Sequence, residues 1–505
     1  MLVPERIEDP LLRWRGDAAQ AGELVDGPRG ERRLDHGQLA SWALRFGHQL
    51  TRHGVKPGDR VAIYLDHVAE AAVALYGAWI VGALAVPVNQ SLKSPQVAHI
   101  LRHSGSLVLV SEPNKLAQLD APTLAGVSTL TVPACETLEG EEQAAALQRT
   151  LPGGNAPAAI LYTSGSTGRP KGILVSHANL RAGARIVAGY LDVRQDERIL
   201  SVLPFSFDYG LNQLLTAVLC GCTLVLQRSH FPSDVLGSLA QHHITALAGV
   251  PPFWIQLMRG APRRLELPLL RYITNSGGTL PVELVKRYRE QLPQVRIHLM
   301  YGLSEAFRST TLPPEELEQR PDSIGRAIPE NEVLVLDPLN APCAPGEQGE
   351  LVHRGPTVTL GYWNDPEASA RVFRPDPDDP GSGRTVVYSG DLVRCDQEGF
   401  LYFVGRRDQL IKSYGYRVSP DEVEELIHDS NLVTEVAVHG RPDEVSGAAI
   451  VAHVIPADPR AFATNTLLDY CRARMPAYMV PKVVEVHDVL PRTPSGKIDR
   501  RALSR

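Results

Sequence analysis

The sequence lacks several features that mark secreted, nucleic-acid-binding and zinc-binding proteins. Residues 1–6 show no basic segment followed by an apolar one, so no secretory signal is predicted. The 51 basic and 57 acidic residues give a net charge of −6, without the basic footprint of a nucleic-acid-binding protein. The six cysteines are scattered, and Cys220 and Cys222 have no partner pair at zinc-ribbon spacing. We therefore expect a reduced, cytoplasmic chain with no nucleic-acid partner.

Long apolar runs are also scarce. Residues 71–88 form the one stretch that is long and apolar enough to suggest a membrane span. The stretch is rich in alanine, contains Gly77 and Gly82, and reaches Pro87 near its end. This pattern predicts a buried helix that runs into a strand, rather than a membrane span. No internal repeat or low-complexity tract is present.

The length and the pattern of elements indicate a multidomain α/β protein. A chain of 505 residues is too long for one compact core, so two or more domains are expected. Residues 34–53 have a helical pattern, and residues 60–65, 107–110 and 128–132 have strand-like patterns. This alternation predicts a mostly parallel sheet with helices between its strands.

Between two strand-like runs, 158–162 and 173–177, lies a glycine- and hydroxyl-rich loop: Thr163-Ser164-Gly165-Ser166-Thr167-Gly168-Arg169-Pro170-Lys171-Gly172. Glycines let the backbone approach an anion closely, and successive amides and hydroxyls can bind phosphate oxygens. The loop is not of the Walker type, because Pro170 stands where that motif has glycine and no helix follows directly. A flexible linker is the alternative, but linkers are not normally flanked by buried strands.

This loop resembles the phosphate-binding signature of the adenylate-forming superfamily, which comprises acyl-CoA synthetases, luciferases and nonribosomal-peptide adenylation enzymes. The resemblance implies a large N-terminal domain of mostly parallel sheets with a β-rich subdomain, and a small, mobile C-terminal α+β domain. It places the domains at 1–407 and 408–505, with the hinge at Asp408. It assigns ATP binding in this loop to Thr163, Ser164, Gly165, Ser166, Thr167, Gly168 and Lys171.

Two further strand-like runs, at 271–276 and 297–301, end where other family motifs begin. If both belong to one parallel sheet, they end at the same edge, where ligands bind in open α/β folds. The first leads into Ser276-Gly277-Gly278 and the second into Tyr301-Gly302-Leu303-Ser304-Glu305. By resemblance, Gly277, Gly278 and Gly302 lie in the ATP site and Ser276 in the substrate site. Tyr301 stacks on adenine, Ser304 contacts the α-phosphate, and Glu305 helps to hold Mg²⁺, a hard cation suited to carboxylate and phosphate oxygens. A solvated surface carboxylate is the alternative for Glu305.

The C-terminal third contains four more residues with implied roles. Asp391 falls where the family's ribose-binding aspartate lies, and a carboxylate can accept from two vicinal hydroxyls. Arg406 lies in the ATP-binding segment before the hinge. By resemblance, Lys412 lies on the face of the C-terminal domain that is presented in the second half-reaction. Lys497, which follows Pro494-Ser495-Gly496, matches the family's catalytic lysine of the first half-reaction. The alternative is a solvated charge, which is the more common role of a lone lysine near a C-terminus.

Three residues bear on the substrate. Phe207-Asp208 matches the pattern of amino-acid-adenylating enzymes, in which the aspartate binds the substrate ammonium, whereas a helix N-cap is the alternative for Asp208. Arg308 falls where the family's acyl pocket is lined, and an unpaired buried guanidinium is costly. Arg308 could pair with Asp208, could bind a second carboxylate of the substrate, or could point to solvent or phosphate.

Together the motifs predict a two-step ligase that uses ATP and Mg²⁺. A small-molecule carboxylate or amino acid would attack the α-phosphate, and a phosphopantetheine thiol would then attack the acyl-adenylate. Because the chain ends eight residues after Lys497, we expect the thiol to come from a separate carrier protein or from coenzyme A. Phe207-Asp208 favours an amino-acid-like substrate and a carrier protein. The alternatives are an acyl-CoA ligase acting on a fatty or other organic acid, and a non-catalytic nucleotide sensor, although Lys497 and Glu305 are both present.

Overall fold

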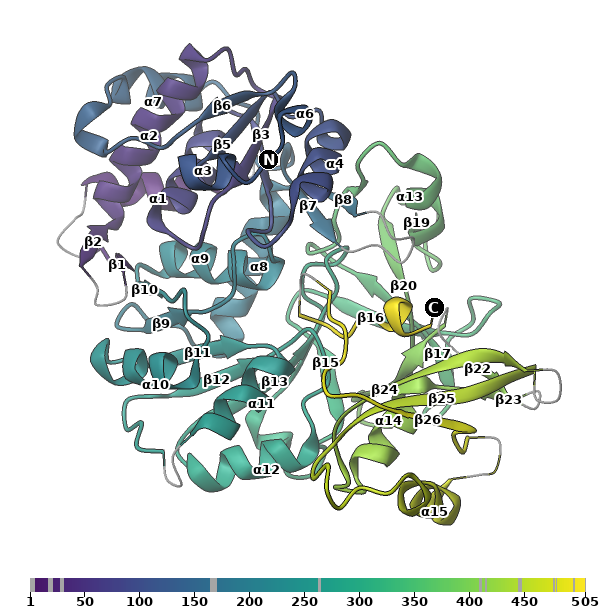
Figure 1. Cartoon of the computed structure of the whole chain (residues 1–505). Coiled ribbons are helices and arrows are strands. Elements are labelled where there is room, and N and C mark those ends of the chain that lie inside the picture. The colour runs from purple at the N-terminus through teal and green to yellow at the C-terminus, as the bar shows by residue number, and fades with distance from the viewer. Residues whose placement is uncertain are drawn as a thin grey trace. The chain divides into compact units, whose positions relative to one another are not determined.

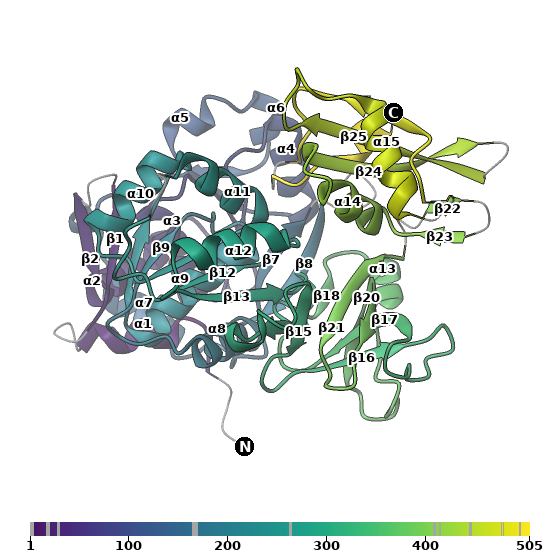
Figure 2. The same ribbon diagram turned by 90° about the horizontal axis from the view of Figure 1, so that it is seen from below.

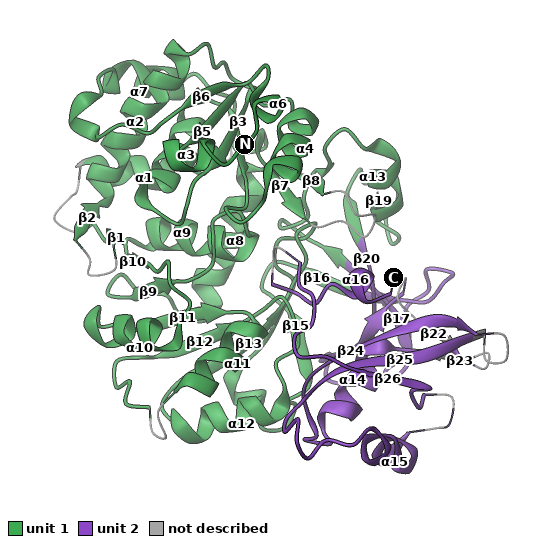
Figure 3. Ribbon diagram, viewed as in Figure 1, with its two compact units in different colours: residues 1–333, 353–387 green, residues 334–352, 388–505 purple. Residues whose placement is uncertain are grey.

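The computed structural model describes residues 5–16, 21–27, 31–163, 170–261, 265–407, 411–413, 416–443, 447–475, 477, 479–493 and 496–504 (Figure 1). The chain divides into two compact units (Figure 3). Unit 1 comprises residues 1–333 and 353–387, and unit 2 comprises residues 334–352 and 388–505. The predicted boundary at 407/408 falls beside residues outside the described ranges, so it stays a prediction.

The first sheet of unit 1 has seven described strands and is buried on both faces. In β3, Val61 and Ile63 pack into one apolar cluster, while Ala62 and Tyr64 pack into another on the opposite face. Such burial of alternate residues on both faces is typical of a sheet with helices on each side. In sheet order the strands are β18 (Gly361–Tyr362), β8 (Lys171–Ser176), β7 (Pro157–Thr163), β4 (Leu84–Pro87), β3 (Arg60–Tyr64), β5 (Val108–Ser111) and β6 (Ser128–Leu130).

Three predicted features of this sheet are confirmed. The pairings β7–β4–β3–β5–β6 are all parallel, as the alternation of elements predicted. Residues 71–88 form a buried helix, α3 (Ala69–Ile80), that leads into β4. The strands on either side of the glycine-rich loop are β7 and β8, which pair antiparallel. No described helix combines the length and hydropathy that a bilayer-spanning segment needs.

The second sheet of unit 1 positions the candidate site. Its parallel strands are covered by helices on both sides, and α12 and α8 lie on opposite sides of β13 (Figure 2). In sheet order the strands here are β2 (Arg32–Asp35), β1 (Glu23–Asp26), β10 (Thr223–Leu226), β9 (Arg198–Ser201), β11 (Ala246–Gly249), β12 (Tyr272–Asn275), β13 (Arg296–Tyr301), β14 (Thr310–Leu312) and β15 (Ser323–Ala327). The strands from β1 to β13 in this order are parallel, whereas β2 is antiparallel to β1, and β14 is antiparallel to β13 and β15. The helices around it include α8 (His177–Leu191), α9 (Asp208–Cys220), α10 (Pro232–Gln241), α11 (Pro251–Gly260) and α12 (Val282–Gln291).

Unit 2 contains strands β16 (Glu332–Leu336), β17 (Gln348–Arg354), β20 (Thr385–Cys395) and β21 (Leu401–Arg406), the first three of which continue into unit 1. It also contains a five-stranded sheet. The strands of that sheet are β23 (Tyr416–Val418), β22 (Ile411–Ser413), β25 (Gly447–Pro456), β24 (Val433–Asp443) and β26 (Val483–Val486). Helices α14 (Pro420–His428) and α15 (Thr464–Arg474) share an apolar core with this sheet. Ser419 caps α14, accepting a hydrogen bond from the amide of Glu422.

Two glycines allow helices α2 (His36–Arg52) and α3 to pack closely. A Cβ on Gly77 would lie 2.9 Å from Cδ1 of Phe46 and 3.2 Å from the carbonyl oxygen of Ala43. A Cβ on Gly47 would lie 3.1 Å from the carbonyl oxygen of Gly77. Because each glycine faces the other helix, a larger side chain at either position would push the helices apart.

Replacing Gly77 with valine should therefore lower the free energy of unfolding by about 1–3 kcal/mol, the usual cost of overpacking a core. Gly189 on α8 is the matched control, because a Cβ there meets no atom within 4 Å. Gly189→Val should leave stability unchanged or slightly higher, since valine is a better helix former than glycine. Guanidinium unfolding followed by tryptophan fluorescence measures both, and equal effects at the two positions would contradict the close packing.

Candidate active site

The candidate site begins at the carboxyl ends of β11, β12 and β13. These strands are parallel and in register, with Gly249 opposite Asn275 and Asn275 opposite Leu299. The prediction that the strands at 271–276 and 297–301 end at one edge is confirmed. The loops that follow them therefore lie side by side, as in ligand sites of open α/β sheets.

The turn after β12 packs closely against Phe207. Gly277 has φ +79°, a conformation that glycine adopts without strain, and a Cβ there would lie 3.6 Å from Cζ of Phe207. The side-chain amide of Asn275 donates to the carbonyl oxygen of Gly278 at 3.0 Å and closes the turn. Ser276 is buried within it. The structure thus places the predicted Ser276-Gly277-Gly278 segment next to the predicted substrate residue Phe207.

Asp208 is the first residue of α9, and Phe207 occupies the N-cap position. The alternative that Asp208 caps this helix is therefore wrong. The Asp208 carboxyl is 6% exposed and accepts a hydrogen bond of 3.1 Å from the hydroxyl of Ser304. A carboxylate in the first turn of a helix is also stabilised by the helix dipole. The residue predicted to bind the α-phosphate and the residue predicted to bind the substrate are thus in direct contact.

Glu305 is held by a tyrosine that the motifs did not single out. The hydroxyl of Tyr362 donates to Oε1 of Glu305 at 2.6 Å, and Nζ of Lys171 lies 5.1 Å from the centre of the same tyrosine ring. Thr359 fixes the backbone, donating through both its amide and its hydroxyl to the carbonyl oxygen of Glu305 at 2.9 Å. Within the described ranges Oε2 of Glu305 makes no hydrogen bond or ion pair. A half-buried carboxylate with one oxygen fixed and the other available fits Mg²⁺, which prefers oxygen ligands.

Tyr301 stacks on His353, another residue that no motif predicted. The two rings lie 6.1 Å apart with an interplanar angle of 23°. His353 is buried, neither ring nitrogen has a hydrogen-bond partner among the described residues, and burial lowers its pKa to about 3. A neutral imidazole therefore supports one side of the tyrosine predicted to stack on adenine.

Arg308 is 3% exposed, so it does not point to solvent. Its guanidinium lies 4.6 Å from the ring centre of Tyr209 and 5.9 Å from that of Phe307. Within the described ranges it forms no ion pair with Asp208, and its Nε and Nη2 atoms are buried without a hydrogen-bond partner. The structural salt bridge considered from the sequence is therefore not formed.

A small cavity of about 30 Å³ lies beside the Tyr209 ring. Asn212 and Gln213 contribute Nδ2 and Oε1 atoms that are buried and lack partners within the described residues. The wall is otherwise mainly apolar, and it also includes Thr274 and Met300. Arg308, Asn212 and Gln213 thus give this part of unit 1 several polar groups without a partner among the described residues.

Within unit 2, Asp391 and Arg406 face each other across β20 and β21. Nη1 of Arg406 donates to Oδ1 of Asp391 at 2.8 Å, and Nη2 donates to the carbonyl oxygen of Ser389 at 3.3 Å. The Arg406 guanidinium holds the buried Asp391 carboxylate in place, so the two predicted ATP-binding residues form an ion pair.

The loop that carries Lys497 is fixed by its neighbours. The amide of Thr493 donates to the carbonyl oxygen of Lys497 at 2.7 Å, and Nη1 of Arg492 donates to that of Gly496 at 2.9 Å. Nη2 of Arg492 also pairs with Glu435 at 2.5 Å. The Lys497 side chain itself is exposed. A constrained backbone with an exposed ammonium suits a residue that must reach a ligand.

Several predicted residues lie outside the described ranges. These are Ser164, Gly165, Ser166, Thr167 and Gly168 of the phosphate loop, and the hinge residue Asp408. Lys412 lies on β22, where its backbone pairs with that of Arg417, but its side chain is not described. Their predicted roles stay predictions.

Comparison with known proteins identifies the class. Residues 14–363 match the family model of the AMP-binding enzymes, and residues 422–497 match that of the AMP-binding enzyme C-terminal domain. The chain therefore belongs to the AMP-binding enzyme family, and it is an AMP-forming acid–thiol ligase. The predicted fold class, a large α/β domain with sheets and a small C-terminal α+β domain, is confirmed.

Three relatives illustrate the range of the family. Long-chain-fatty-acid–CoA ligase FadD13 of Mycobacterium tuberculosis is 32% identical, over 98% of this chain and 97% of that protein. A linear gramicidin synthase of Brevibacillus parabrevis is 31% identical, over 94% of this chain and 9% of that protein. The structure of O-succinylbenzoate coenzyme A synthetase of Bacillus subtilis with ATP and magnesium ion has a TM-score of 0.85 and 28% identity, over 98% of this chain and 99% of that chain.

Replacing Tyr362 with phenylalanine tests whether this tyrosine positions Glu305. The variant keeps the ring beside Lys171 but loses the hydroxyl, and a hydrogen bond to a charged group is worth about 1.5–3 kcal/mol. We expect kcat/KM for Mg-ATP to fall about 10- to 100-fold and the Mg²⁺ concentration for half-maximal rate to rise, measured by ATP–pyrophosphate exchange.

Tyr288→Phe is the control, because the Tyr288 hydroxyl donates to the buried carbonyl oxygen of Trp254 at 2.8 Å, a structural hydrogen bond. That variant should lose stability without any change in Mg²⁺ dependence. An unaltered Mg²⁺ dependence in Tyr362→Phe would show that Tyr362 does not orient a metal-binding carboxylate.

Proposed function

We propose that this protein is an AMP-forming acid–CoA ligase that activates a small carboxylic acid as an acyl-adenylate and transfers the acyl group to coenzyme A. The observation that carries the proposal is the end-to-end match to FadD13, a CoA ligase, together with a site in which Ser304–Asp208 and Tyr362–Glu305 pairs are assembled. The O-succinylbenzoate coenzyme A synthetase has the same fold along almost its whole length. These relatives support coenzyme A over a carrier protein as the acceptor.

The proposed chemistry has two displacements. In the first, a carboxylate oxygen forms a bond to the α-phosphorus of Mg-ATP and pyrophosphate leaves. Lys497, Lys171 and the ion bound by Glu305 would offset the charge of two anions brought together. In the second, the thiol sulfur forms a bond to the acyl carbon, its proton is released and AMP leaves.

A carrier protein as acceptor, with an amino-acid-like substrate, is the second candidate. It is supported by the Phe207-Asp208 pair at the start of α9 and by the match to the linear gramicidin synthase. The Asp208 carboxylate, held by Ser304, could accept hydrogen bonds from a substrate ammonium.

An acceptor assay separates the two candidates. The protein is first screened by ATP–pyrophosphate exchange over amino acids and over fatty, aryl and dicarboxylic acids. The best acid is then supplied with coenzyme A or with phosphopantetheinylated carrier proteins, and thioester and AMP are quantified. We expect the acyl-CoA with equimolar AMP. Thioester on a carrier protein alone, with coenzyme A inert for every activated acid, would overturn the proposed acceptor.

We also propose a cytoplasmic location and a hinged mechanism. All six cysteines are described and none forms a disulfide, which supports a reducing compartment.

A lysine that neutralises phosphate oxygens in the first step would obstruct the thiol in the second. Rotation of the segment 408–505 about Asp408 would remove it and present Lys412 instead.

Lys497→Ala should therefore separate the half-reactions. Because the lysine charge is needed only while phosphoryl oxygens are crowded, adenylate formation should fall at least about 100-fold. Thioester formation from supplied acyl-adenylate should be largely unchanged. Single-turnover assays measure each step, and an equal loss in both would contradict the alternation.

We propose further that the acid carries a second anionic or strongly polar group. A buried guanidinium without an anion is costly, and Arg308 has two unsatisfied nitrogens next to Tyr209. The unsatisfied Asn212 and Gln213 atoms at the neighbouring cavity add hydrogen-bonding capacity that an aliphatic chain would not use. A dicarboxylic acid, including a dicarboxylic amino acid whose ammonium meets Asp208, fits these groups.

Replacing Arg308 with methionine, which keeps most of the side-chain length without charge, tests this substrate class. For a dicarboxylic acid the loss of transition-state stabilisation should be about 2–5 kcal/mol, measured as kcat/KM in pyrophosphate exchange. Arg185→Met, at an exposed ion pair with Glu330, is the control and should change little. Preference for a plain fatty or aryl acid, undiminished in Arg308→Met, would contradict the substrate class.

A further inference from the structure

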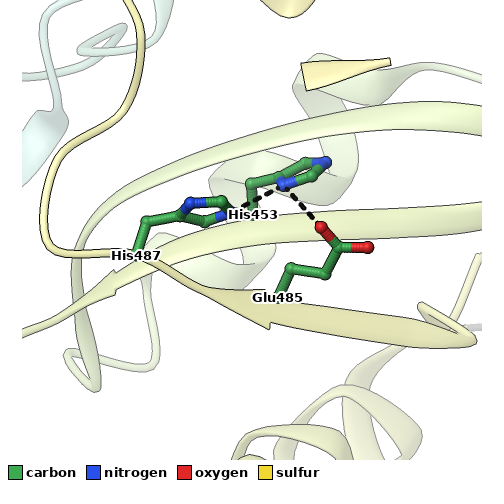
Figure 4. Close-up of side chains that lie close together, drawn as sticks. All are labelled: His453, Glu485 and His487. Carbon is green, nitrogen blue, oxygen red and sulfur yellow. Dashed lines mark hydrogen bonds and ion pairs between the residues drawn. The ribbon is translucent and has the colours of Figure 1, made fainter. Parts of the chain in front are cut away.

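Three histidines and a glutamate gather on one face of the five-stranded sheet of unit 2, and Figure 4 shows three of these four side chains. His453 on β25 pairs in register with Glu485 on the parallel strand β26, so both side chains emerge on the same face. His487 lies two residues beyond Glu485, and His439 lies on β24 two residues beyond Ala437, the partner of His453. Val438 and Val454, on the opposite face, pack into the apolar core with α14 and α15.

The side chains meet through atoms that can bind a metal. Nδ1 of His453 lies 2.9 Å from Nε2 of His487 and 3.4 Å from Oε2 of Glu485. One ligand atom from each of the three residues lies within 4.8 Å of the other two. His453 is 2% exposed, whereas Glu485 and His487 are half-buried, so two of the three side chains are partly open to solvent.

The hydrogen-bond network determines which nitrogen of His453 carries its proton. Nδ1 of His439 lies 3.1 Å from the carbonyl oxygen of Gly440, which can only accept, so this nitrogen carries the proton. Nε2 of neutral His439 is then an acceptor, and it lies 3.0 Å from Nε2 of His453, which must donate. The remaining nitrogen of neutral His453, Nδ1, therefore presents a lone pair toward Glu485 and His487.

A lone pair facing a carboxylate oxygen is repulsive unless a proton or a metal ion lies between them. In the absence of a cation, His487 can donate to Nδ1 of His453, but Oε2 of Glu485 then faces the same nitrogen without a proton to share. A bound metal ion would satisfy all three groups, because imidazole nitrogen and carboxylate oxygen both donate lone pairs to it.

Two further residues act as the outer shell of such a site. His439 accepts from the distal nitrogen of His453, as the second partner of a metal-bound imidazole usually does. Nη2 of Arg441 donates to Oε1 of Glu485 at 2.9 Å, which leaves Oε2 directed toward His453. Both contacts fix the orientation of a ligand before a metal arrives.

We propose that His453, His487 and Glu485 bind a divalent transition-metal ion, with Zn²⁺ the best fit, at a site separate from the Mg²⁺ used with ATP. Zinc–ligand distances of about 2.0–2.1 Å place neighbouring ligands of a tetrahedron about 3.3 Å apart, close to the 2.9 and 3.4 Å separations. Two imidazoles select zinc and its neighbours over Mg²⁺, which prefers oxygen. Water would supply the fourth ligand.

The ion would link β25 to the segment that leaves β26. His487 lies just past the end of β26, and the chain continues from there to the Lys497 loop. Metal binding would therefore hold β26 and the start of that segment against β25, and it should stabilise the folded state in proportion to its binding free energy.

Metal binding by the full-length, untagged protein tests the site. After removal of metals with a chelator, the protein is titrated with Co²⁺, a spectroscopic probe for tetrahedral zinc sites, and with Zn²⁺ in a competition assay. We expect one Co²⁺ per chain with visible d–d absorption, displacement by Zn²⁺, no displacement by Mg²⁺, and a rise in Tm with Zn²⁺. His487→Ala and Glu485→Gln, both at half-buried positions, should weaken binding at least about tenfold and abolish the Tm rise.

His53→Ala is the control, because His53 is an exposed histidine at the end of α2 in unit 1 and is not a member of the cluster. It should bind Co²⁺ as the unaltered protein does. Stoichiometric binding that survives both His487→Ala and Glu485→Gln would place the metal elsewhere. Failure of the unaltered protein to bind would show that the cluster is a metal-free hydrogen-bonded chain of imidazoles. Either result overturns the proposal whatever acid the enzyme activates.

Discussion

The parallel, in-register pairing of β11, β12 and β13 is the constraint on which the active site depends. Parallel strands all end at one edge, so the chain must leave three neighbouring strands within a short distance. Each exit carries a different group: the segment before α11, the glycine turn of Gly277, and the segment from Tyr301 to Glu305. The glycine turn can lie against Phe207 because it has no side chain there. The backbone hydrogen bonds of the sheet thus bring together side chains that lie far apart in the sequence.

Polar contacts between distant segments then fix the loops. Ser304 reaches Asp208 across 96 residues of sequence, and Tyr362 reaches Glu305 across 57. Such contacts are strong because the groups are partly buried and one partner in each is a carboxyl group. A site built in this way has its charges oriented before ligands bind, which is what stabilisation of a phosphoryl transition state requires.

Buried polar atoms that have no partner, or an ill-matched one, among the described residues are the most informative feature of both units. In unit 1, Arg308 has no anion within the described residues, and the free energy of burying it is offset only partly by the Tyr209 ring. In unit 2, Nδ1 of His453 lies against both Nε2 of His487 and Oε2 of Glu485. A substrate would satisfy the first group and a metal ion the second. The two proposals are independent, because they rest on different residues in different units.

The sequence by itself determined the fold class and predicted most of the residues of the candidate site. Alternating apolar runs and glycine turns are local signals, and they correctly placed the buried helix α3, the strands on either side of the glycine-rich loop and the shared edge of β12 and β13. The motif Tyr301–Glu305 could be recognised for the same reason, because its residues are adjacent in the sequence. The roles implied for Lys497, Asp391 and the phosphate loop came from motifs alone.

Only the tertiary structure decided which distant residues meet. Tyr362 and His353 carry no motif, and their contacts with Glu305 and Tyr301 arise because β18 and β17 return to the site from later in the chain. The pairing of Arg308 with Asp208, plausible from charge, does not occur within the described structure. The histidines of unit 2 lie 14 and 34 residues apart in sequence and meet through strand register. Sequence patterns report local periodicity, whereas such contacts depend on the register and order of strands, which no single segment encodes.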